Sequence, residues 1–134
     1  MLDHVFLSAS DLARSVTFYE KALAPLGIAH YVDYDGKDGP PGHPDLKGFG
    51  REKRAFFWLK QGHADPRSVH VGFVASNAEE VNAFYEAAIA AGARDNGRPA
   101  ARTYYDPRYY AANVLDPDGY SIEVVFKKWQ HPPP

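Results

Sequence analysis

Phe18-Tyr19-Glu20 returns 66 residues later as Phe84-Tyr85-Glu86, and this repeat decides the fold. Two further pairs keep the same spacing: His4-Val5 with His70-Val71, and Ala9-Ser10 with Ala75-Ser76. The match covers a strand, the turn after it and the following helix. Self-similarity at a fixed period indicates that one folding unit is present twice. Since a histidine stands at the same point of both copies, the two imidazoles could converge on one site.

The first unit begins with a strand over residues 2–9, in which the side chains alternate between an apolar and a polar-tolerant face. Ser10 can cap the following helix, whose apolar residues recur at helical spacing until Pro25 and Gly27 end it. Residues 28–59 predict shorter strands around a loop at 35–45, which is rich in glycine and proline and is expected to be exposed and mobile. Residues 55–59 close the unit as a strand.

The second unit repeats this plan. Residues 69–74 predict its first strand, and residues 76–79 form a capping-box pattern ahead of a helix that Gly92 ends. After a turn-rich stretch, residues 109–115 and 120–126 predict two antiparallel strands joined by a tight turn. We therefore predict an α+β fold of two tandem β-α-β-β-β modules, whose curved mixed sheets surround a cleft. One domain is expected over residues 1–134, with module one at 1–64, module two at 65–126 and a tail at 127–134.

The composition excludes several classes of protein. A chain of 134 residues suits one compact domain. Cysteine is absent, which excludes disulfides, thiolate metal sites and a cysteine nucleophile, and a cytoplasmic location is the matching expectation. The formal net charge of −2 offers no broad basic surface, so nucleic acid is not an expected partner. No stretch approaches the roughly 20 apolar residues of a membrane span, so no membrane association is expected.

Three side chains of metal-ligand type are predicted to share one face. In the closing strand, alternation turns Glu123 away from the apolar face that packs on a helix. His4 and His70 likewise lie opposite the apolar residues of their strands. Two imidazoles and one carboxylate form a facial triad, a ligand set suited to Fe(II), Mn(II) or related ions that leaves positions open for substrate.

The paired modules, the histidine on the first strand of each, and the closing run Tyr-Ala-Ala-Asn-Val-Leu-Asp-Pro-Asp-Gly-Tyr-Ser-Ile-Glu at 110–123 resemble the vicinal oxygen chelate superfamily. That superfamily includes glyoxalase I, fosfomycin resistance proteins, extradiol dioxygenases and bleomycin resistance proteins. By this resemblance, His4, His70 and Glu123 match metal-ligand positions of the catalytic branches. Glyoxalase I has a fourth ligand, a glutamate, on the last strand of its first unit, and Trp58 stands at the corresponding place here. True glyoxalase I activity is therefore not expected.

Four further residues are candidates for substrate contacts. Trp58 can form the wall of an apolar pocket or fill the core. Tyr110 could donate a catalytic hydrogen bond if its side of the strand faces inward. Arg102 and Arg108 could bind a carboxylate or phosphonate group of the substrate. The other histidines have no spacing that supports a ligand role, although His43, in the loop at 35–45, could close over a ligand.

The sequence and the resemblance together lead to two alternative functions. The first is a homodimeric metalloprotein with one divalent metal per site, drawn from Fe, Mn, Ni, Co or Zn, which activates a small substrate through adjacent oxygens as a lyase, isomerase, transferase or dioxygenase. The second is a metal-free protein that binds a small molecule or sequesters an antibiotic, similar to the bleomycin resistance proteins. Whether the modules close on each other within one chain or exchange between subunits stays open.

Overall fold

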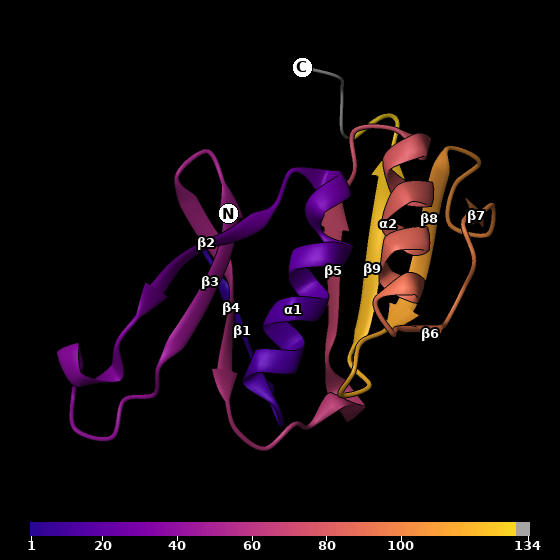
Figure 1. Ribbon diagram of the computed structural model, residues 1–134. Helices are drawn as coiled ribbons and strands as arrows, with labels where there is room; N and C mark the ends of the chain where they lie inside the picture. Colours follow the sequence, from indigo (N-terminus) through magenta and orange to yellow (C-terminus); the bar gives the residue numbers. More distant parts are fainter. Residues whose placement is uncertain (131–134) are drawn as a thin grey trace.

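The computed structural model describes residues 1–130 and confirms the α+β fold with two mixed sheets (Figure 1). Module one contains β1 (Val5–Ala9), α1 (Leu12–Ala22), β2 (Ala29–Tyr34), β3 (Leu46–Arg51) and β4 (Arg54–Gln61). Module two contains β5 (His70–Val74), α2 (Ala78–Ala90), β6 (Arg94–Asp95), β7 (Ala100–Ala101), β8 (Tyr109–Leu115) and β9 (Ser121–Lys127). The predicted tail begins at Lys127, which is the last residue of β9, and residues 131–134 lie outside the described part of the chain.

The two sheets have the same plan with one difference. The first sheet has the order β1-β4-β3-β2, and the second has the order β5-β9-β8-β6 with β7 also paired to β8. In each sheet the first strand runs parallel to the last strand of its module, and the other pairs are antiparallel. The strand that would correspond to β2 is reduced in module two to the two short pieces β6 and β7. Gly97 lies between these pieces with a φ of +142°, a conformation that interrupts a regular strand.

Both helices lie on the same face of the two sheets and pack against each other (Figure 1). One hydrophobic core runs under both modules, since α1 contributes Phe18 and α2 contributes its counterpart Phe84, both fully buried. Phe57 on β4 and Phe73 on β5 join the modules directly, with ring centroids 5.2 Å apart. The repeated Phe-Tyr-Glu segments are therefore packing elements. The opposite faces of the two sheets carry no helix from the described residues.

Both helix starts lie one residue later than predicted. Asp11 rather than Ser10 caps α1, and its carboxylate accepts from the backbone N–H of Arg14 at 3.1 Å. Asn77 caps α2 by accepting from the N–H of Glu80, whose own carboxylate accepts from the N–H of Ser76 at 2.7 Å. Ser, Asp and Asn all cap helices well, so these residue types locate the start of each helix only to within one residue.

The turn between β8 and β9 fastens module two to module one. Asp116 is buried and accepts a hydrogen bond from the hydroxyl of Tyr19 on α1 at 2.6 Å. Asp118 accepts from the N–H of Ser10 at 3.0 Å and pairs with Arg14 at 3.2 Å. The hydroxyl of Tyr120 donates to the backbone carbonyl of Ser8 at 2.7 Å. Three side chains of one turn thus hold the other module at the end of β1 and along α1.

The loop at 35–45 is tied together by its own hydrogen bonds. Residues 36–38 form a short 3-10 helix, and the N–H of Gly36 donates to the carboxylate of Asp45 at 2.8 Å. The ring of His43 lies against Gly39, where an added Cβ would come within 2.8 Å of it.

None of the helices formed by residues 1–130 is long and apolar enough to cross a membrane.

Candidate functional site

The helix-free face of the second sheet gathers the polar side chains of the candidate site. On β5, Phe73 is buried toward the helices, while His70 and Gly72 are exposed on the other face. On β9, Ile122 and Val124 are fully buried, so Glu123 points to the same open face as His70. The parallel register places Gly72 opposite Glu123. The alternation predicted for these two strands is therefore present, and small Gly72 leaves room between the imidazole and the carboxylate.

His70 and Glu123 form a close and oriented pair. Nε2 of His70 lies 3.4 Å from Oε1 of Glu123, and Nδ1 of the same ring lies 2.8 Å from the hydroxyl of Ser121. The Ser121 hydroxyl can accept from Nδ1–H, which leaves the Nε2 lone pair directed toward the carboxylate. Two ligand atoms that each lie about 2.1 Å from one tetrahedral cation are about 3.4 Å apart. These two residues therefore fit a shared cation.

Two neighbours on β8 hold the carboxylate of Glu123, whose side chain is only 12% exposed. The hydroxyl of Tyr109 donates a short hydrogen bond to Oε2, and Nδ2 of Asn113 donates to Oε1 at 3.1 Å. Burial, reinforced by the hydrogen bond and charge of Glu123, raises the pKa of Tyr109 above its ordinary value. Tyr109 therefore keeps its proton and acts as a fixed donor to the carboxylate.

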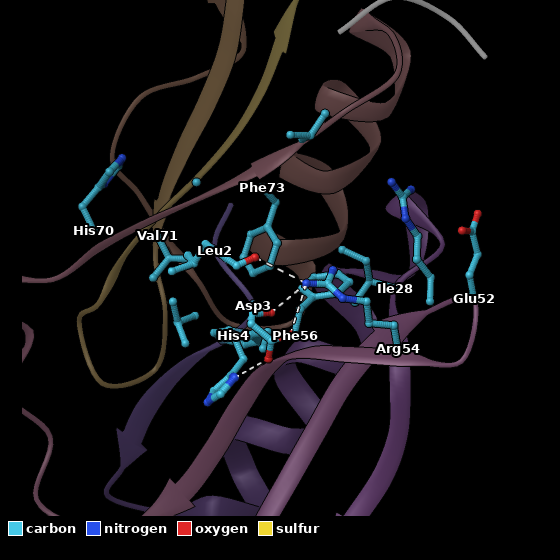
Figure 2. Close-up of a pocket in the computed structure, with 15 residues that line it drawn as sticks. Leu2, Asp3, His4, Ile28, Glu52, Arg54, Phe56, His70, Val71 and Phe73 are labelled. Carbon is cyan, nitrogen blue, oxygen red and sulfur yellow. Dashed lines mark hydrogen bonds and ion pairs between the residues drawn. The ribbon is translucent and has the colours of Figure 1, made fainter. Parts of the chain in front are cut away.

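His4 lies apart from this pair within one chain. Its Nδ1 is 2.5 Å from the carboxylate of Asp3, and this hydrogen bond lowers the pKa of Asp3. His4 and His70 both line a cavity of about 580 Å³ between the modules, which we call the inter-module cavity. Figure 2 shows the two rings at separate places on its rim, with the ring of His4 turned toward Asp3. Among residues 1–130, no group of three histidine or acidic side chains is close enough to hold a metal ion.

Trp58 occupies the position in module one that Glu123 occupies in module two. Phe6, two residues after His4, pairs with Trp58, just as Gly72, two residues after His70, pairs with Glu123. Trp58 lies in a hollow of about 360 Å³, here called the module-one hollow. Its lining comprises Asp3, His4, Phe6, Tyr34, His43, Leu46, Ala55 and Trp58. Trp58 and Glu123 are therefore counterparts in the register of the two sheets.

A second hollow of about 350 Å³, the module-two hollow, is centred on the polar pair. Its lining comprises His70, Asn96, Gly97, Arg102, Tyr104, Tyr105, Asn113 and Glu123. The guanidinium of Arg102 donates to the backbone carbonyl of Arg98 at 2.9 Å, which holds this cation at the wall of the hollow. Tyr104 and Tyr105 are highly exposed and stand at its edge, with ring centroids 4.6 Å apart. Arg102 thus lines the same hollow as the His70–Glu123 pair.

Tyr110 and Arg108, also predicted as site residues, are not brought to these hollows. Tyr110 points to the helix side of β8, where its hydroxyl donates to the side-chain carbonyl of Asn82 at 2.8 Å. Its neighbour Tyr109 takes the place beside Glu123, because adjacent residues of a strand face opposite ways. Arg108 forms two hydrogen bonds of 3.0 Å with Asp106 and lies over the ring of Trp129. This charge is already neutralised and does not line the hollow that contains Glu123.

Sequence reasoning missed three residues of the site: Ser121, Asn113 and Tyr109. Ser121 and Glu123 are two residues apart on one strand, so the alternation that indicates Glu123 also places Ser121 on the same face, although it does not assign a role to its hydroxyl. Asn113 and Tyr109 depend on the register between β8 and β9, in which Asn113 pairs with Glu123. Five residues, 116–120, separate the paired ends of the strands, rather than the four of a simple tight turn. That one additional residue decides which tyrosine reaches the carboxylate.

Comparison with known proteins gives one consistent family. A model of the Glyoxalase/Bleomycin resistance protein/Dioxygenase superfamily matches residues 1–124. A glyoxalase/bleomycin resistance protein from Albidiferax ferrireducens T118 is 26% identical, with a TM-score of 0.74 over 94% of this chain and 98% of that one. Glyoxalase I from Zea mays is 23% identical, with a TM-score of 0.70 over 94% of this chain and 46% of the longer maize chain. A search of curated protein sequences gave no match.

Proposed function

The chain belongs to the Glyoxalase/Bleomycin resistance protein/Dioxygenase superfamily, and from this membership we propose a metal-dependent enzyme that holds a small substrate through neighbouring oxygen atoms. His70 and Glu123 would bind a divalent cation, one of Fe, Mn, Ni, Co or Zn. The observation that carries the proposal is the separation of 3.4 Å between Nε2 of His70 and Oε1 of Glu123, with Nδ1 of the ring engaged by Ser121. A bound cation would supply charge stabilisation at a substrate oxygen.

The residues around the pair would keep it ready for the cation. Tyr109 and Asn113 fix the carboxylate of Glu123, and Ser121 fixes the ring of His70, so little side-chain freedom is lost on binding. Partners of this kind typically change metal affinity by about 10-fold to 100-fold. Arg102 would bind an anionic group of the substrate, because its guanidinium lines the module-two hollow beside Glu123. Tyr109, rather than Tyr110, would be the phenol of the site.

His4 would be the third protein ligand, supplied by a second copy of the chain in a homodimer. Within one chain His4 is not grouped with His70 and Glu123, yet its own Nδ1 is engaged by Asp3, as the Nδ1 of His70 is by Ser121. The first strand of each module, β1 and β5, stands at an end of its sheet in the described part of the chain. Exposed Leu2, which precedes β1, and exposed Val74, the last residue of β5, line the inter-module cavity. A second copy would cover this apolar surface.

The test is equilibrium unfolding of the metal-free protein, with and without each candidate ion. An ion that binds only the folded state, at 100 times its dissociation constant, adds about 2.7 kcal/mol to the free energy of unfolding. Glu123→Gln and His70→Ala should lose most of this gain, whereas Glu86→Gln, on the exposed face of α2, should keep it. The proposal is removed if none of the five ions stabilises the parent protein.

A metal-free binding protein is the second candidate, favoured by the lack of a three-ligand group among residues 1–130 of one chain and by the aromatic lining of the module-one hollow. In that case the His70–Glu123 pair would be a simple ion pair that binds the ligand by hydrogen bonds. The unfolding series separates the two candidates, because only the metalloenzyme gains stability from an ion in a way that depends on Glu123.

A further inference from the structure

We propose that the module-one hollow binds a flat aromatic ring that carries a hydroxyl or N–H group, with Phe6 and Trp58 as its floor and His43 as its hydrogen-bond acceptor. The inference rests on the proposed function in one respect, namely that the ring would belong to the small molecule whose oxygens reach the metal. The hollow itself is lined by residues that the proposed metal site does not use, with one exception. Of the three predicted metal ligands, it contains His4 alone.

The floor consists of two rings from neighbouring strands. Phe6 on β1 and Trp58 on β4 lie opposite each other, with ring centroids 6.5 Å apart and planes within 28° of parallel. The indole lies over Gly48 on β3, where an added Cβ would come within 2.7–3.0 Å of three of its atoms. Gly48 thus lets the indole lie down on the sheet. The resulting surface suits a ligand ring, because aromatic rings pack well in offset, near-parallel arrangements.

The loop at 35–45 supplies the wall. The ring of His43 meets that of Tyr34 edge-on, with centroids 5.1 Å apart, and both residues line the hollow beside Trp58. Gly36 and Gly39 allow His43 to approach this closely. An added Cβ at Gly36 would come 2.1 Å from the carbonyl oxygen of His43. The glycine-rich composition of the loop therefore has a role in shaping the hollow.

His43 also provides the polar contact. Its Nδ1 lies 2.8 Å from the carbonyl oxygen of Pro44, and a carbonyl can only accept, so Nδ1 carries the hydrogen. In the neutral ring, Nε2 is then an acceptor, and no hydrogen bond to Nε2 is formed by any residue in the range 1–130. A hydroxyl or N–H group on the ligand ring would satisfy it.

The volume of the module-one hollow and the charges of its lining residues restrict the class of ligand further. About 360 Å³ holds a molecule of one or two fused rings. Neither lysine nor arginine is among the lining residues, and the one carboxylate, Asp3, is engaged by His4 and lies 3.9 Å from Arg54. A neutral ring therefore fits better than an anion. His4 would lie beside this ring, since its imidazole meets Phe6 edge-on with centroids 5.3 Å apart.

The chain offers a direct reporter, because Trp58 and Trp129 are its two tryptophans. Titration of ¹⁵N-labelled protein with 2-naphthol should shift the indole N–H signal of Trp58 saturably and leave that of Trp129 unchanged, with Trp129→Phe assigning the signals. The saturated analogue trans-decahydro-2-naphthol has a similar outline but no π face. It should bind about tenfold more weakly. No shift of the Trp58 signal, parallel shifts of both signals, or equal affinity for the two compounds would overturn the proposal.

Variants locate the contact and keep it separate from the metal site. Trp58→Leu should weaken binding of 2-naphthol about tenfold, and Trp58→Phe, which keeps a ring on the floor, only about threefold. His43→Leu should weaken it about fivefold through the lost acceptor. If Trp58→Leu fails to fold, the Phe variant and the saturated analogue still decide the outcome. The double variant His70→Ala, Glu123→Gln should bind 2-naphthol as the parent does, so failure of the metal proposal and failure of the ring proposal give different results.

Discussion

The β1–β4 pair of module one and the β5–β9 pair of module two have the same register and opposite chemistry. Phe6 faces Trp58 in the first, and Gly72 faces Glu123 in the second. The next strand continues the contrast, because Gly48 pairs with Trp58 whereas Asn113 pairs with Glu123. One scaffold thus presents two stacked rings on one sheet, and an imidazole, a carboxylate and their donors on the other.

The two modules share one fold, but the open faces of their sheets present different kinds of side chain. Each sheet has a glycine at a different place. In module one, Gly48 lies under the indole of Trp58, and in module two, Gly72 leaves space beside the carboxylate of Glu123. His4 and His70 are the only histidines at the same point of both repeats. The aromatic half would hold the body of a ligand, and the polar half would hold the cation and the ligand oxygens.

The largest effect is expected at the turn that joins the modules, where the repeat gives a matched pair of tyrosines. Tyr19 is fully buried and bonded to Asp116, whereas its counterpart Tyr85 is half-buried on α2. Asp116→Ala should cost about 3 kcal/mol, because buried donors lose their acceptor. Tyr19→Phe should cost about 2 kcal/mol and Tyr85→Phe less than about 0.5 kcal/mol. Urea unfolding measures all three, and equal losses for the two tyrosines would break the contrast.

The two glycines on the open faces should respond differently to a single methyl group. An alanine at Gly48 would meet the ring of Trp58 at 2.7 Å, while a Cβ at Gly72 has nothing within 4 Å. Gly48→Ala should therefore destabilise the protein by about 2 kcal/mol, and Gly72→Ala by less than about 0.5 kcal/mol. The Trp58 indole signal should move in the first variant alone. A silent Gly48→Ala would show that the indole does not lie on β3.

The adjacent residues Tyr109 and Tyr110 on β8 are expected to have different roles, one beside Glu123 and one on the helix side of the sheet. Tyr109→Phe removes a donor from the carboxylate of Glu123 and should weaken metal binding about tenfold. Tyr110→Phe removes a bond to Asn82 on the helix side, so it should lower stability by about 1 kcal/mol and leave metal affinity unchanged. Calorimetric titration of both variants with the preferred ion compares them, and the reverse order of effects would restore Tyr110 to the site.

The last expected effect concerns the pH dependence of stability. Burial raises the pKa of Asp116 above its ordinary value, although the hydrogen bond from Tyr19 opposes this. Between the unfolded and folded pKa values the folded protein binds more protons, so the contribution of Asp116 to stability is lost as pH rises through this window. Relative to Asp116→Asn, the parent should therefore lose stability from about pH 4 upward, by at most about 1.4 kcal/mol per pH unit. A difference that grows in the opposite direction would contradict this shift.

Local patterns predicted the elements and their faces. The 66-residue repeat gave the tandem modules, and strand alternation placed His70 and Glu123 on one open face, since each strand buries its apolar side chains against a helix. The pairing of Phe6 with Trp58 in the first sheet repeats this strand arrangement. These features depend on neighbours in sequence or on one strand pair, and such patterns are readable from the chain alone.

Features set by longer-range packing could not be predicted. The separation of His4 from His70 depends on how two modules dock, which is set by Phe57 against Phe73 and by the Asp116 turn. No periodic pattern encodes that docking. The place of Tyr109 depends on one additional residue in the β8–β9 connection, and a shift of one residue turns every side chain to the other face.

If His4 of one copy joins His70 and Glu123 of another, two defective variants should complement each other when they are mixed. His4→Ala and Glu123→Ala should each bind little metal alone. After they are unfolded together and refolded, half of the dimers should pair one variant with the other, and each mixed dimer should contain one intact site. Metal analysis of the purified mixed dimer should then give about one ion per two chains. A mixed dimer that binds no more metal than its parents would contradict a shared site.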